Sequence, residues 1–308
     1  MRVLVTGGAG FIGSHIVDLL VEAGHCVSIV DNLLTGKRER IHPRARFYPV
    51  DIRDKDALIG VFAGEAPEVV VHQAAQYSLR VSARDPVLDA TVNILGMVNL
   101  LQCCTTFGTR KVVFASTAAI YGPVEQMPIT EETPQRPVMP YGITKLAGEH
   151  YLRYWKAQHG LDYTILRYGN VYGPRQDANG ESGVIAIFIG RMLRAHPVRI
   201  DWDGEQRKDY VYVRDVARAN LLALTQGGGE TFCIATGKGT SVNEIRQTLA
   251  SILGYDVETQ PGPMQAGDVP LIVFDCQKAK ERLGWQPEMG LADGLHVTLD
   301  YFRKEMGL

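Results

Sequence analysis

The chain has 308 residues, 45% of them hydrophobic, with 32 Lys+Arg against 34 Asp+Glu and a formal net charge of -2. This composition is typical of a globular protein and excludes a disordered chain, a collagen and a small disulfide scaffold. The charges are balanced and no block of five like charges occurs, so we expect neither a nucleic-acid-binding surface nor a polybasic membrane helix. We expect a small-molecule partner.

Cysteine usage and the N-terminal sequence indicate the compartment. The five cysteines form no C-x-x-C pair, and a chain of this length needs no disulfides to make up for a small core. A glycine-rich motif begins at Gly7, which leaves no room for a signal peptide, and no apolar stretch reaches the roughly 20 residues of a membrane span. The histidines show no metal-binding spacing. We expect a cytoplasmic protein without a metal site.

Short β-branched runs alternate with longer amphipathic stretches along the first half of the chain. Strands are expected at 2–5, 26–30, 46–50, 69–72, 111–115 and 163–167. Helices are expected at 12–23, 55–62, 85–107 and 141–159, the last three ending near a glycine at 64, 108 or 160. Strand–helix alternation predicts an α/β, doubly wound parallel sheet of the Rossmann type.

Beyond residue 169 the pattern is less regular. The expected elements are helices at 184–195, 215–225, 242–253, 276–283 and 291–304, and strands at 210–213 and 231–235. We predict that 1–169 plus 206–235 form the larger domain, which contains the Rossmann sheet. The remainder, 170–205 plus 236–308, would form a smaller α/β substrate domain over the carboxyl ends of the strands.

The stretch TGGAGFIG at 6–13 follows the first expected strand. Gly8, Gly10 and Gly13 satisfy G-x-G-x-x-G, and Gly7, Gly10 and Gly13 satisfy G-x-x-G-x-x-G. Without Cβ atoms the backbone can turn tightly and approach a pyrophosphate, which binds at the N–H groups of the helix that follows. Either motif alone is weak, and a glycine turn that binds nothing is the alternative. Its position between a strand and a helix favours a dinucleotide site.

Asp31 ends the second expected strand eighteen residues after Gly13, near the spacing of the acid that binds the adenosine ribose. A carboxylate there accepts hydrogen bonds from the ribose hydroxyls and repels a 2′-phosphate. Asn32, which follows, carries no charge, so we predict NAD rather than NADP. Asp51 and Ile52, after the third strand, are placed at the adenine. For Asp51 a helix N-cap is an equally good interpretation.

Tyr141 and Lys145 stand at i and i+4 on one face of an expected helix. A fixed cation beside a phenol favours the phenolate, so we expect Lys145 to bring the pKa of Tyr141 toward neutrality. Thr117 lies just past an expected strand, where its hydroxyl would face the same crevice. A Y-x-x-x-K motif alone is common by chance. The glycine motif, Asp31 and these three residues, however, follow the order that a hydride-transfer site requires.

Over essentially its whole length the sequence resembles the extended short-chain dehydrogenase/reductases, the NAD-dependent epimerase/dehydratase family, and among them most the UDP-glucose 4-epimerases. The matching stretches are TGGAGFIGSH at 6–15, VDNLLTGK at 30–37, HQAAQ at 72–76, YGITK at 141–145, LRYGNVYGPRQD at 166–177, GVIAIF at 183–188, DYVYVRDVARAN at 209–220 and KAKERLGWQP at 278–287.

The resemblance implies tightly held NAD, a nucleotide-sugar substrate and a homodimer formed through the helices 85–107 and 141–159. The residues that we assign to the cofactor are Gly7, Gly10, Phe11, Ile12, Gly13, Asp31, Asn32, Asp51, Ile52, Gln73, Ala74, Ala75, Asn93, Tyr141, Lys145 and Tyr168. Those that we assign to the substrate are Thr117, Asn170, Val184, Lys208, Gln265 and Asp268.

The implied chemistry is a redox cycle at C4 of the sugar without net oxidation. Tyr141 removes the proton of the C4 hydroxyl, Thr117 hydrogen-bonds that oxygen, and hydride passes to NAD and returns to the opposite face of a 4-keto sugar. Related dehydratases and decarboxylases carry an acid just beyond the catalytic Thr, whereas Ala118 follows here. We therefore expect 4-epimerisation of the UDP-glucose/UDP-galactose type. Another sugar-nucleotide epimerase or reductase, or a non-catalytic NAD sensor, is the alternative.

Two positions depart from the family pattern at the diphosphate. Lys208 in GEQRKD at 204–209 and Gln265 in QAGD at 265–268 stand where the family has arginines. Relative to two arginines, one formal charge and both planar guanidinium groups are therefore lost. Arg207 adjoins Lys208, but neighbours on an extended strand point to opposite faces. We expect weaker binding of the diphosphate than in a relative with both arginines.

Overall fold

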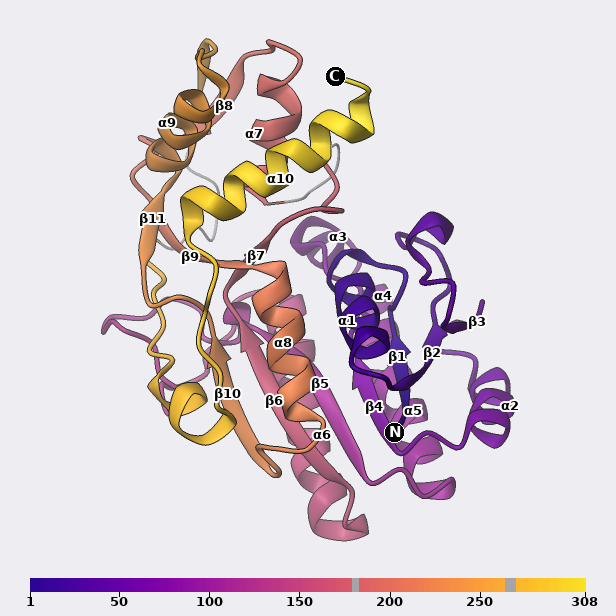
Figure 1. Ribbon diagram of the computed structural model, residues 1–308. Helices are drawn as coiled ribbons and strands as arrows, with labels where there is room; N and C mark the ends of the chain where they lie inside the picture. The colour runs from indigo at the N-terminus through magenta and orange to yellow at the C-terminus, as the bar shows by residue number, and fades with distance from the viewer. Residues whose placement is uncertain (179–182, 264–269) are drawn as a thin grey trace.

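A seven-stranded parallel sheet dominates the computed structural model, which describes residues 1–178, 183–263 and 270–308. Its strand order is β10–β6–β5–β4–β1–β2–β3, so the direction of winding reverses at β1 (Figure 1). This arrangement confirms the predicted doubly wound Rossmann fold. The strands are β1 (Arg2–Thr6), β2 (Cys26–Val30), β3 (Arg46–Tyr48), β4 (Val69–His72), β5 (Lys111–Thr117), β6 (Asp162–Tyr168) and β10 (Glu230–Ile234).

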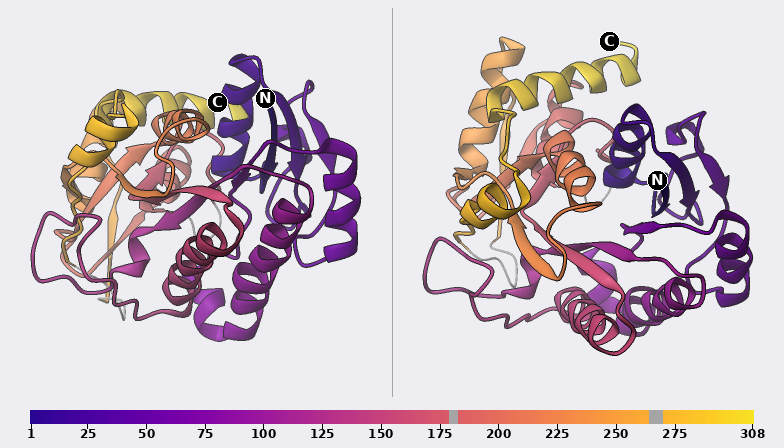
Figure 2. Two further views of the ribbon diagram at one scale, coloured as in Figure 1. Left: turned by 90° about the horizontal axis from the view of Figure 1, so that it is seen from below. Right: turned by 60° about the horizontal axis from the view of Figure 1, so that its bottom comes forward.

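Helices cover both faces of this sheet, which Figure 2 shows between its two helical layers in the left view. On one face α1 (Phe11–Glu22) packs against α8 (Val213–Ala223). The other face carries α2 (Lys55–Glu65), α5 (Gly96–Thr106) and α6 (Pro140–His159). The shorter segments are α3 (Leu79–Arg84), α4 (Pro86–Ala90) and the 3-10 turns Arg38–Arg40 and Ala118–Ile120.

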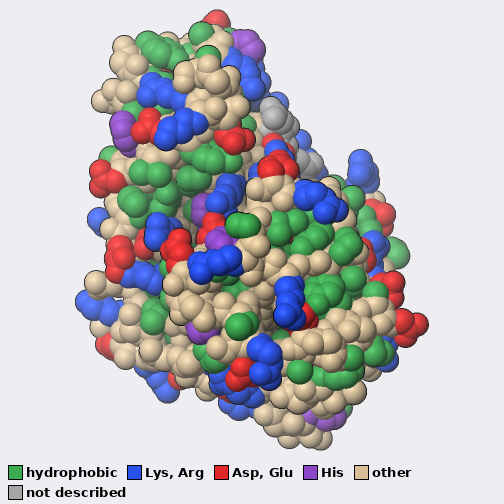
Figure 3. Space-filling view, turned by 45° about the vertical axis from the view of Figure 1, so that its right-hand side comes forward, with side chains coloured by type: hydrophobic (Ala, Val, Ile, Leu, Met, Phe, Trp, Pro, Cys, Tyr) green, Lys and Arg blue, Asp and Glu red, His purple; other side chains and the backbone are tan. Residues whose placement is uncertain are grey.

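Charged side chains of both signs lie on the face of the molecule that Figure 3 shows. On the face shown in Figure 3, Lys and Arg alternate with Asp and Glu, and apolar areas separate them.

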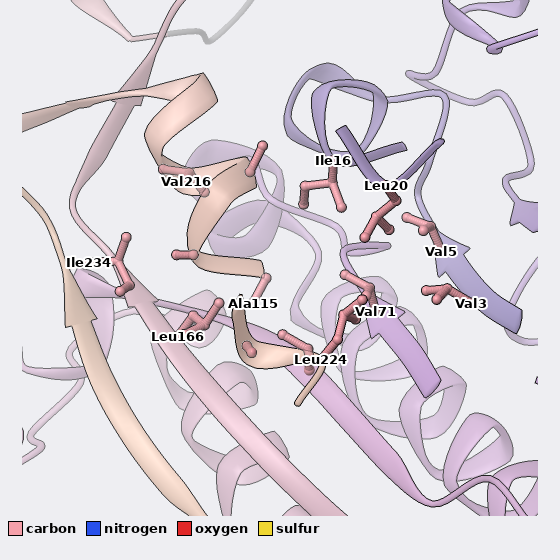
Figure 4. Close-up of a cluster of buried hydrophobic side chains, with 14 of the residues drawn as sticks. Val3, Val5, Ile16, Leu20, Val71, Ala115, Leu166, Val216, Leu224 and Ile234 are labelled. Atoms are coloured by element: carbon pink, nitrogen blue, oxygen red, sulfur yellow. The ribbon is translucent and has the colours of Figure 1, made fainter. Parts of the chain in front are cut away.

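Alternate residues of the strands face opposite core layers. Val3 and Val5 of β1 pack with Ile16 and Leu20 of α1 on one side (Figure 4). Leu4, between the two valines, faces the cluster of α2, α5 and α6 on the other side. A parallel sheet buried on both faces requires such continuous apolar strands. The polar groups of a binding site are consequently found at the strand ends.

A second group of elements continues from the carboxyl end of the large sheet. β7 (Asn170–Tyr172) starts two residues after β6 ends and joins β9 (Arg207–Tyr212) and β11 (Gly239–Ser241) in a three-stranded sheet. The other elements of this group are the paired strands β8 (Val198–Asp201) and β12 (Thr259–Gly262), and the helices α7 (Val184–Met192), α9 (Val242–Leu253) and α10 (Leu291–Met306). The division into two domains stays a prediction. β9 pairs within the small sheet, and the chain returns to the large sheet only with β10, after α8.

Several helices differ from their predicted form. The expected helix 85–107 consists of α4, the π-helical turn Thr91–Leu95 and α5, and the expected helix 276–283 contains a second π-helical turn, Ala279–Leu283. α3 was not expected. α2 continues past Gly64 and ends where Ala66 adopts a left-handed conformation with φ 43°. Apolar periodicity does not distinguish an α-helical from a π-helical turn, so these boundaries depend on tertiary contacts.

One expectation about apolar stretches is corrected. The helical run Pro86–Thr106 has 21 residues and contains an 18-residue window with a mean hydropathy of 1.4, so it is long and apolar enough by composition to cross a membrane. Within it, however, Asp89 and Asn93 are buried. Asp89 accepts hydrogen bonds from Gln76 and Thr144, and Asn93 donates one to Thr144. Buried polar groups with partners on other elements are typical of a core helix, and we interpret the run as one.

Candidate active site

The glycine motif forms the turn between β1 and α1. Gly7 has φ +71°, and a Cβ there would lie 2.7 Å from the backbone nitrogen of Ala74. A Cβ on Gly13 would lie 2.1 Å from the carbonyl oxygen of Gly7. Gly10 offers α1 no side-chain cap, so the first-turn N–H groups of Phe11 and Ile12 can receive a ligand. This cradle fits the pyrophosphate of a dinucleotide.

Asp31 lies beside this turn at the carboxyl end of β2. Its Oδ2 accepts a hydrogen bond from the Ala9 N–H at 3.0 Å, and its Oδ1 accepts one from the Leu33 N–H at 2.8 Å. Burial raises the pKa of Asp31, and these two backbone hydrogen bonds partly offset the rise. Each oxygen retains a lone pair that could accept a ribose hydroxyl. The residue therefore fits the ribose-binding role predicted for it.

Asp31→Ala is expected to weaken NAD binding and to reduce the difference in affinity between NAD and NADP. The substitution removes both the acceptor for the ribose hydroxyls and the repulsion of a 2′-phosphate. Calorimetric titration of the two nucleotides measures the effect. Asp56→Ala, which removes an exposed carboxylate from α2, is the matched control. NADP binding as tight as NAD binding in the wild type would refute this role of Asp31.

Asp51 belongs to a separate cluster at the end of β3. Arg53 donates two side-chain hydrogen bonds to its carboxylate, at 2.9 and 2.8 Å, and Asn32 Nδ2 donates a third at 2.7 Å. The hydrogen bonds from Arg53 hold the pKa of Asp51 well below its usual range. The alternative role of helix N-cap is wrong for Asp51, because Asp54 caps α2 by accepting from the Ala57 N–H. A position at the adenine stays a prediction for Asp51, and for Ile52, whose side chain is buried.

The loop after β4, which carries Ala74 and Ala75, is held at both ends. Gln73 Nε2 and Asn220 Nδ2 both donate to the Tyr168 hydroxyl, at 3.2 and 2.8 Å. Asn93 accepts from the Gln76 N–H at 2.8 Å and donates to the Gln76 carbonyl at 3.0 Å. Tyr168 and Asn93 therefore position the predicted cofactor loop.

Thr117, Tyr141 and Lys145 come together at the carboxyl end of β5. Thr117 is the last residue of that strand, and Tyr141 follows Pro140, the first residue of α6. The Thr117 and Tyr141 side chains are hydrogen-bonded. Lys145 Nζ donates to the Ala115 carbonyl at 2.9 Å and lies 6.0 Å from the centre of the Tyr141 ring. The structure therefore gathers the three residues predicted to be catalytic.

The pKa of Tyr141 does not follow the expectation. Burial raises it to about 12, and the hydrogen bond with Thr117 offsets only part of the rise. In the protein alone Lys145 does not bring the phenol toward neutrality, because its ammonium group points at the Ala115 carbonyl. Burial lowers the pKa of Lys145 to about 8, against the opposing effect of the Asp89 charge.

The predicted substrate residues lie on the small sheet and on α7. Asn170 pairs with Tyr210, so Asn170, Tyr210 and Lys208 share one face of the sheet. Val184 is the first residue of α7. Two further predicted residues lie outside the described residues, namely Gln265 and Asp268.

Arg207 forms an ion pair with α9. It stands on the face opposite Lys208, and its guanidinium donates to Glu244 at 2.9 and 3.2 Å. Glu244 also completes the capping box of α9 with Ser241. This ion pair agrees with the expectation that Arg207 is no simple replacement for a diphosphate arginine, which stays a prediction.

A buried ion pair beneath the catalytic trio was not predicted. Arg167 is 1% and Glu149 0% exposed, and the guanidinium donates to both carboxylate oxygens, at 2.9 and 2.7 Å. Ser116, next to Thr117, also donates to Glu149 at 2.7 Å. Two signals could have indicated the pair: a charged residue inside an apolar strand, and an acid four residues after Lys145 on the same helix face.

Known proteins of one family resemble this chain over nearly its whole length. A model of the NAD-dependent epimerase/dehydratase family matches residues 3–235. The chain is 45% identical over 302 residues to the putative UDP-glucose 4-epimerase of Methanocaldococcus jannaschii, with 98% of each chain covered. It is 41% identical over 312 residues to the UDP-glucose 4-epimerase of Mycolicibacterium smegmatis, with 99% of each covered.

Solved structures are equally similar. The UDP-glucose 4-epimerase of Thermotoga maritima with UDP-glucose superimposes with a TM-score of 0.98 at 49% identity, over 99% of this chain and 100% of that one. The Thermus thermophilus enzyme with NAD gives 0.94 at 46% identity, over 98% and 99%. The chain belongs to the NAD-dependent epimerase/dehydratase family. NAD is its cofactor, and the resemblance inferred from the sequence is confirmed.

Proposed function

We propose that this enzyme interconverts the C4 epimers of a UDP-hexose, of the UDP-glucose/UDP-galactose type, through a 4-keto intermediate. The observation that carries the proposal is the meeting of Thr117, Tyr141 and Lys145 at the carboxyl end of β5, on the same edge of the parallel sheet as the glycine turn. The names of the most similar relatives support the same substrate class.

The chain's own residues bind the sugar and move its proton. When bound, NAD supplies the hydride acceptor and then the hydride donor for C4, and its oxidised ring adds a positive charge that favours a phenolate. Tyr141 takes the proton of the C4 hydroxyl and later returns it, and Thr117 hydrogen-bonds the same oxygen. Lys145 provides a fixed cation beside the phenol. The keto sugar must turn over between the two half-reactions, so that its opposite face is reduced.

The residues just after Thr117 favour epimerisation over elimination. Ala118–Ile120 form a 3-10 turn there, without the carboxyl group that a dehydratase would need at this point. A panel of UDP-glucose, UDP-galactose and their N-acetylated and uronic relatives, assayed for 4-epimerisation, tests the assignment. The alternative of a non-catalytic sensor predicts no NADH absorbance on addition of any of these sugars.

Lys208 and Gln265 provide a prediction about affinity. If the diphosphate binds at these residues, Gln265→Arg is expected to tighten UDP-glucose binding roughly tenfold, because hydrogen bonds to a charged partner are worth about 1.5–3 kcal/mol. kcat should change little, since the contact is the same in ground and transition states. Calorimetry measures the affinities for UDP and UDP-glucose, with Lys208→Arg as the parallel variant. Unchanged or weaker binding in both variants would place the diphosphate elsewhere.

We also propose a homodimer and a cytoplasmic location. The helical run 86–106 and α6 expose large apolar side chains, with Val87 74%, Leu95 58% and Ile143 51% exposed. An apolar groove of about 400 Å³ lies between Pro86 and Leu95. Such a surface is typical of a helix–helix interface between subunits. All five cysteines are unpaired, which agrees with a reducing compartment.

A further inference from the structure

Asp89 is a buried carboxylate for which the proposed chemistry has no use. It lies on the five-residue helix α4 and is 0% exposed. Its Oδ2 accepts from the Thr144 hydroxyl at 2.7 Å, and its Oδ1 accepts from Gln76 Nε2 at 2.9 Å and Asn93 Nδ2 at 3.3 Å. A buried charge costs free energy that only good partners offset, so the burial of this carboxylate requires a reason.

All three partners belong to the candidate site. Thr144 stands on α6 between Tyr141 and Lys145, and Gln76 follows the cofactor loop. Asn93 holds the backbone of Gln76 and also donates to Thr144 at 3.2 Å. One carboxylate therefore connects the catalytic helix with the loop expected to contact NAD.

The charge of Asp89 also acts on both ionisable catalytic residues. It raises the pKa of Lys145, against the burial that lowers it, and it adds to the burial that raises the pKa of Tyr141. Removing the charge should therefore lower both pKa values.

The other ionisable groups named here are paired, neutral or exposed. Glu149 is paired with Arg167. His72 on β4 is neutral, because burial lowers its pKa to about 3. On α3, which packs against α4 and α6, Arg80 and Arg84 are exposed.

We propose that Asp89 is a positioning residue for the reaction, which keeps the Lys145 cation and the cofactor loop in place around Tyr141. This inference rests on the proposed function for its kinetic consequences. Its electrostatic part concerns the protein alone and can be measured without substrate.

Asp89→Asn separates charge from shape. The amide oxygen can still accept from Gln76 and Asn93, and the amide nitrogen can donate to Thr144, whose proton then turns to the Tyr141 carbonyl at 3.1 Å. We expect both limbs of the kcat–pH profile to move to lower pH by about one unit, with little change in KM. Asp85→Asn is the matched control, because Asp85 is the exposed N-cap of the same helix and Asn caps equally well.

A second readout needs no turnover. Tyrosinate absorbance is titrated in the wild type and in Asp89→Asn, and the titration curve of the corresponding Tyr141→Phe variant is subtracted from each. The difference gives the ionisation of Tyr141, and we expect this step at lower pH in Asp89→Asn. Thr144→Val, which retains the Asp89 charge but loses a hydrogen bond, should lower kcat without moving the pH profile. Should Asp89→Asn fold poorly, wild-type kcat in Thr144→Val would overturn the proposal.

The two proposals fail in different ways. An active wild type with an unmoved profile and an unmoved Tyr141 step in Asp89→Asn would overturn the role of Asp89. A moved Tyr141 step in a protein that epimerises no nucleotide sugar would support the placement of the charge and overturn the proposed function.

Discussion

Tyr141→Phe is expected to lower kcat by about a hundredfold to ten-thousandfold, the usual contribution of a positioned acid–base group. The ring and its packing remain, so the fold and the affinity for NAD should persist. Loss of the phenol oxygen removes both the acceptor for the C4 hydroxyl proton and the partner of Thr117. Steady-state kinetics with UDP-galactose, alongside calorimetry for NAD, separate the two effects.

Tyr154→Phe is the control for this change. Tyr154 lies on the same helix but is 53% exposed. It should behave as the wild type. Turnover in Tyr141→Phe close to the wild-type rate would show that the proton is moved by another group, and the proposed mechanism would have to be abandoned.

Glu149→Ala is expected to lower the free energy of unfolding by about 3–5 kcal/mol, because Arg167 would remain buried without its counter-charge. Denaturant unfolding followed by circular dichroism measures the change. Arg153→Ala removes only the partner of Glu149 that is 37% exposed, and should cost at most about 1 kcal/mol. Equal losses in the two variants would contradict the importance of the buried pair.

The pair also gives stability a pH dependence of known sign. Burial alone would raise the pKa of Glu149, but the hydrogen bonds and charge of Arg167 hold it below its usual value. A carboxyl group whose pKa is lower in the folded state stabilises above its unfolded pKa, and this contribution is lost as the pH falls through the folded pKa. Unfolding profiles in acid should therefore differ between the wild type and Glu149→Ala.

Local sequence signals were sufficient for the frame of the site. The glycine turn, Asp31 at the end of β2, and the Tyr141–Lys145 spacing each depend on short-range geometry, and the structure places them as predicted. The parallel sheet followed from alternation of strands and helices, because parallel strands need crossover helices.

Features that depend on contacts between distant segments could not be predicted. The engagement of Asp51 by Asn32 and the raised pKa of Tyr141 both depend on side-chain direction and burial rather than on spacing. The π-helical turn that carries Asn93 could not be predicted either, because the apolar residues in and around it follow an ordinary helical rhythm. Such turns are frequent at functional sites.

The fate of the hydrogen on C4 tests the central claim most directly. UDP-galactose deuterated at C4 should give UDP-glucose that retains its deuterium, because the hydrogen leaves and returns as hydride without contact with water. Nuclear magnetic resonance of the product reports both the epimerisation and the fate of the deuterium. The product should form with the wild type and be absent with Tyr141→Phe. Loss of the deuterium to solvent would contradict hydride transfer, and no interconversion at all would contradict the assignment as a 4-epimerase.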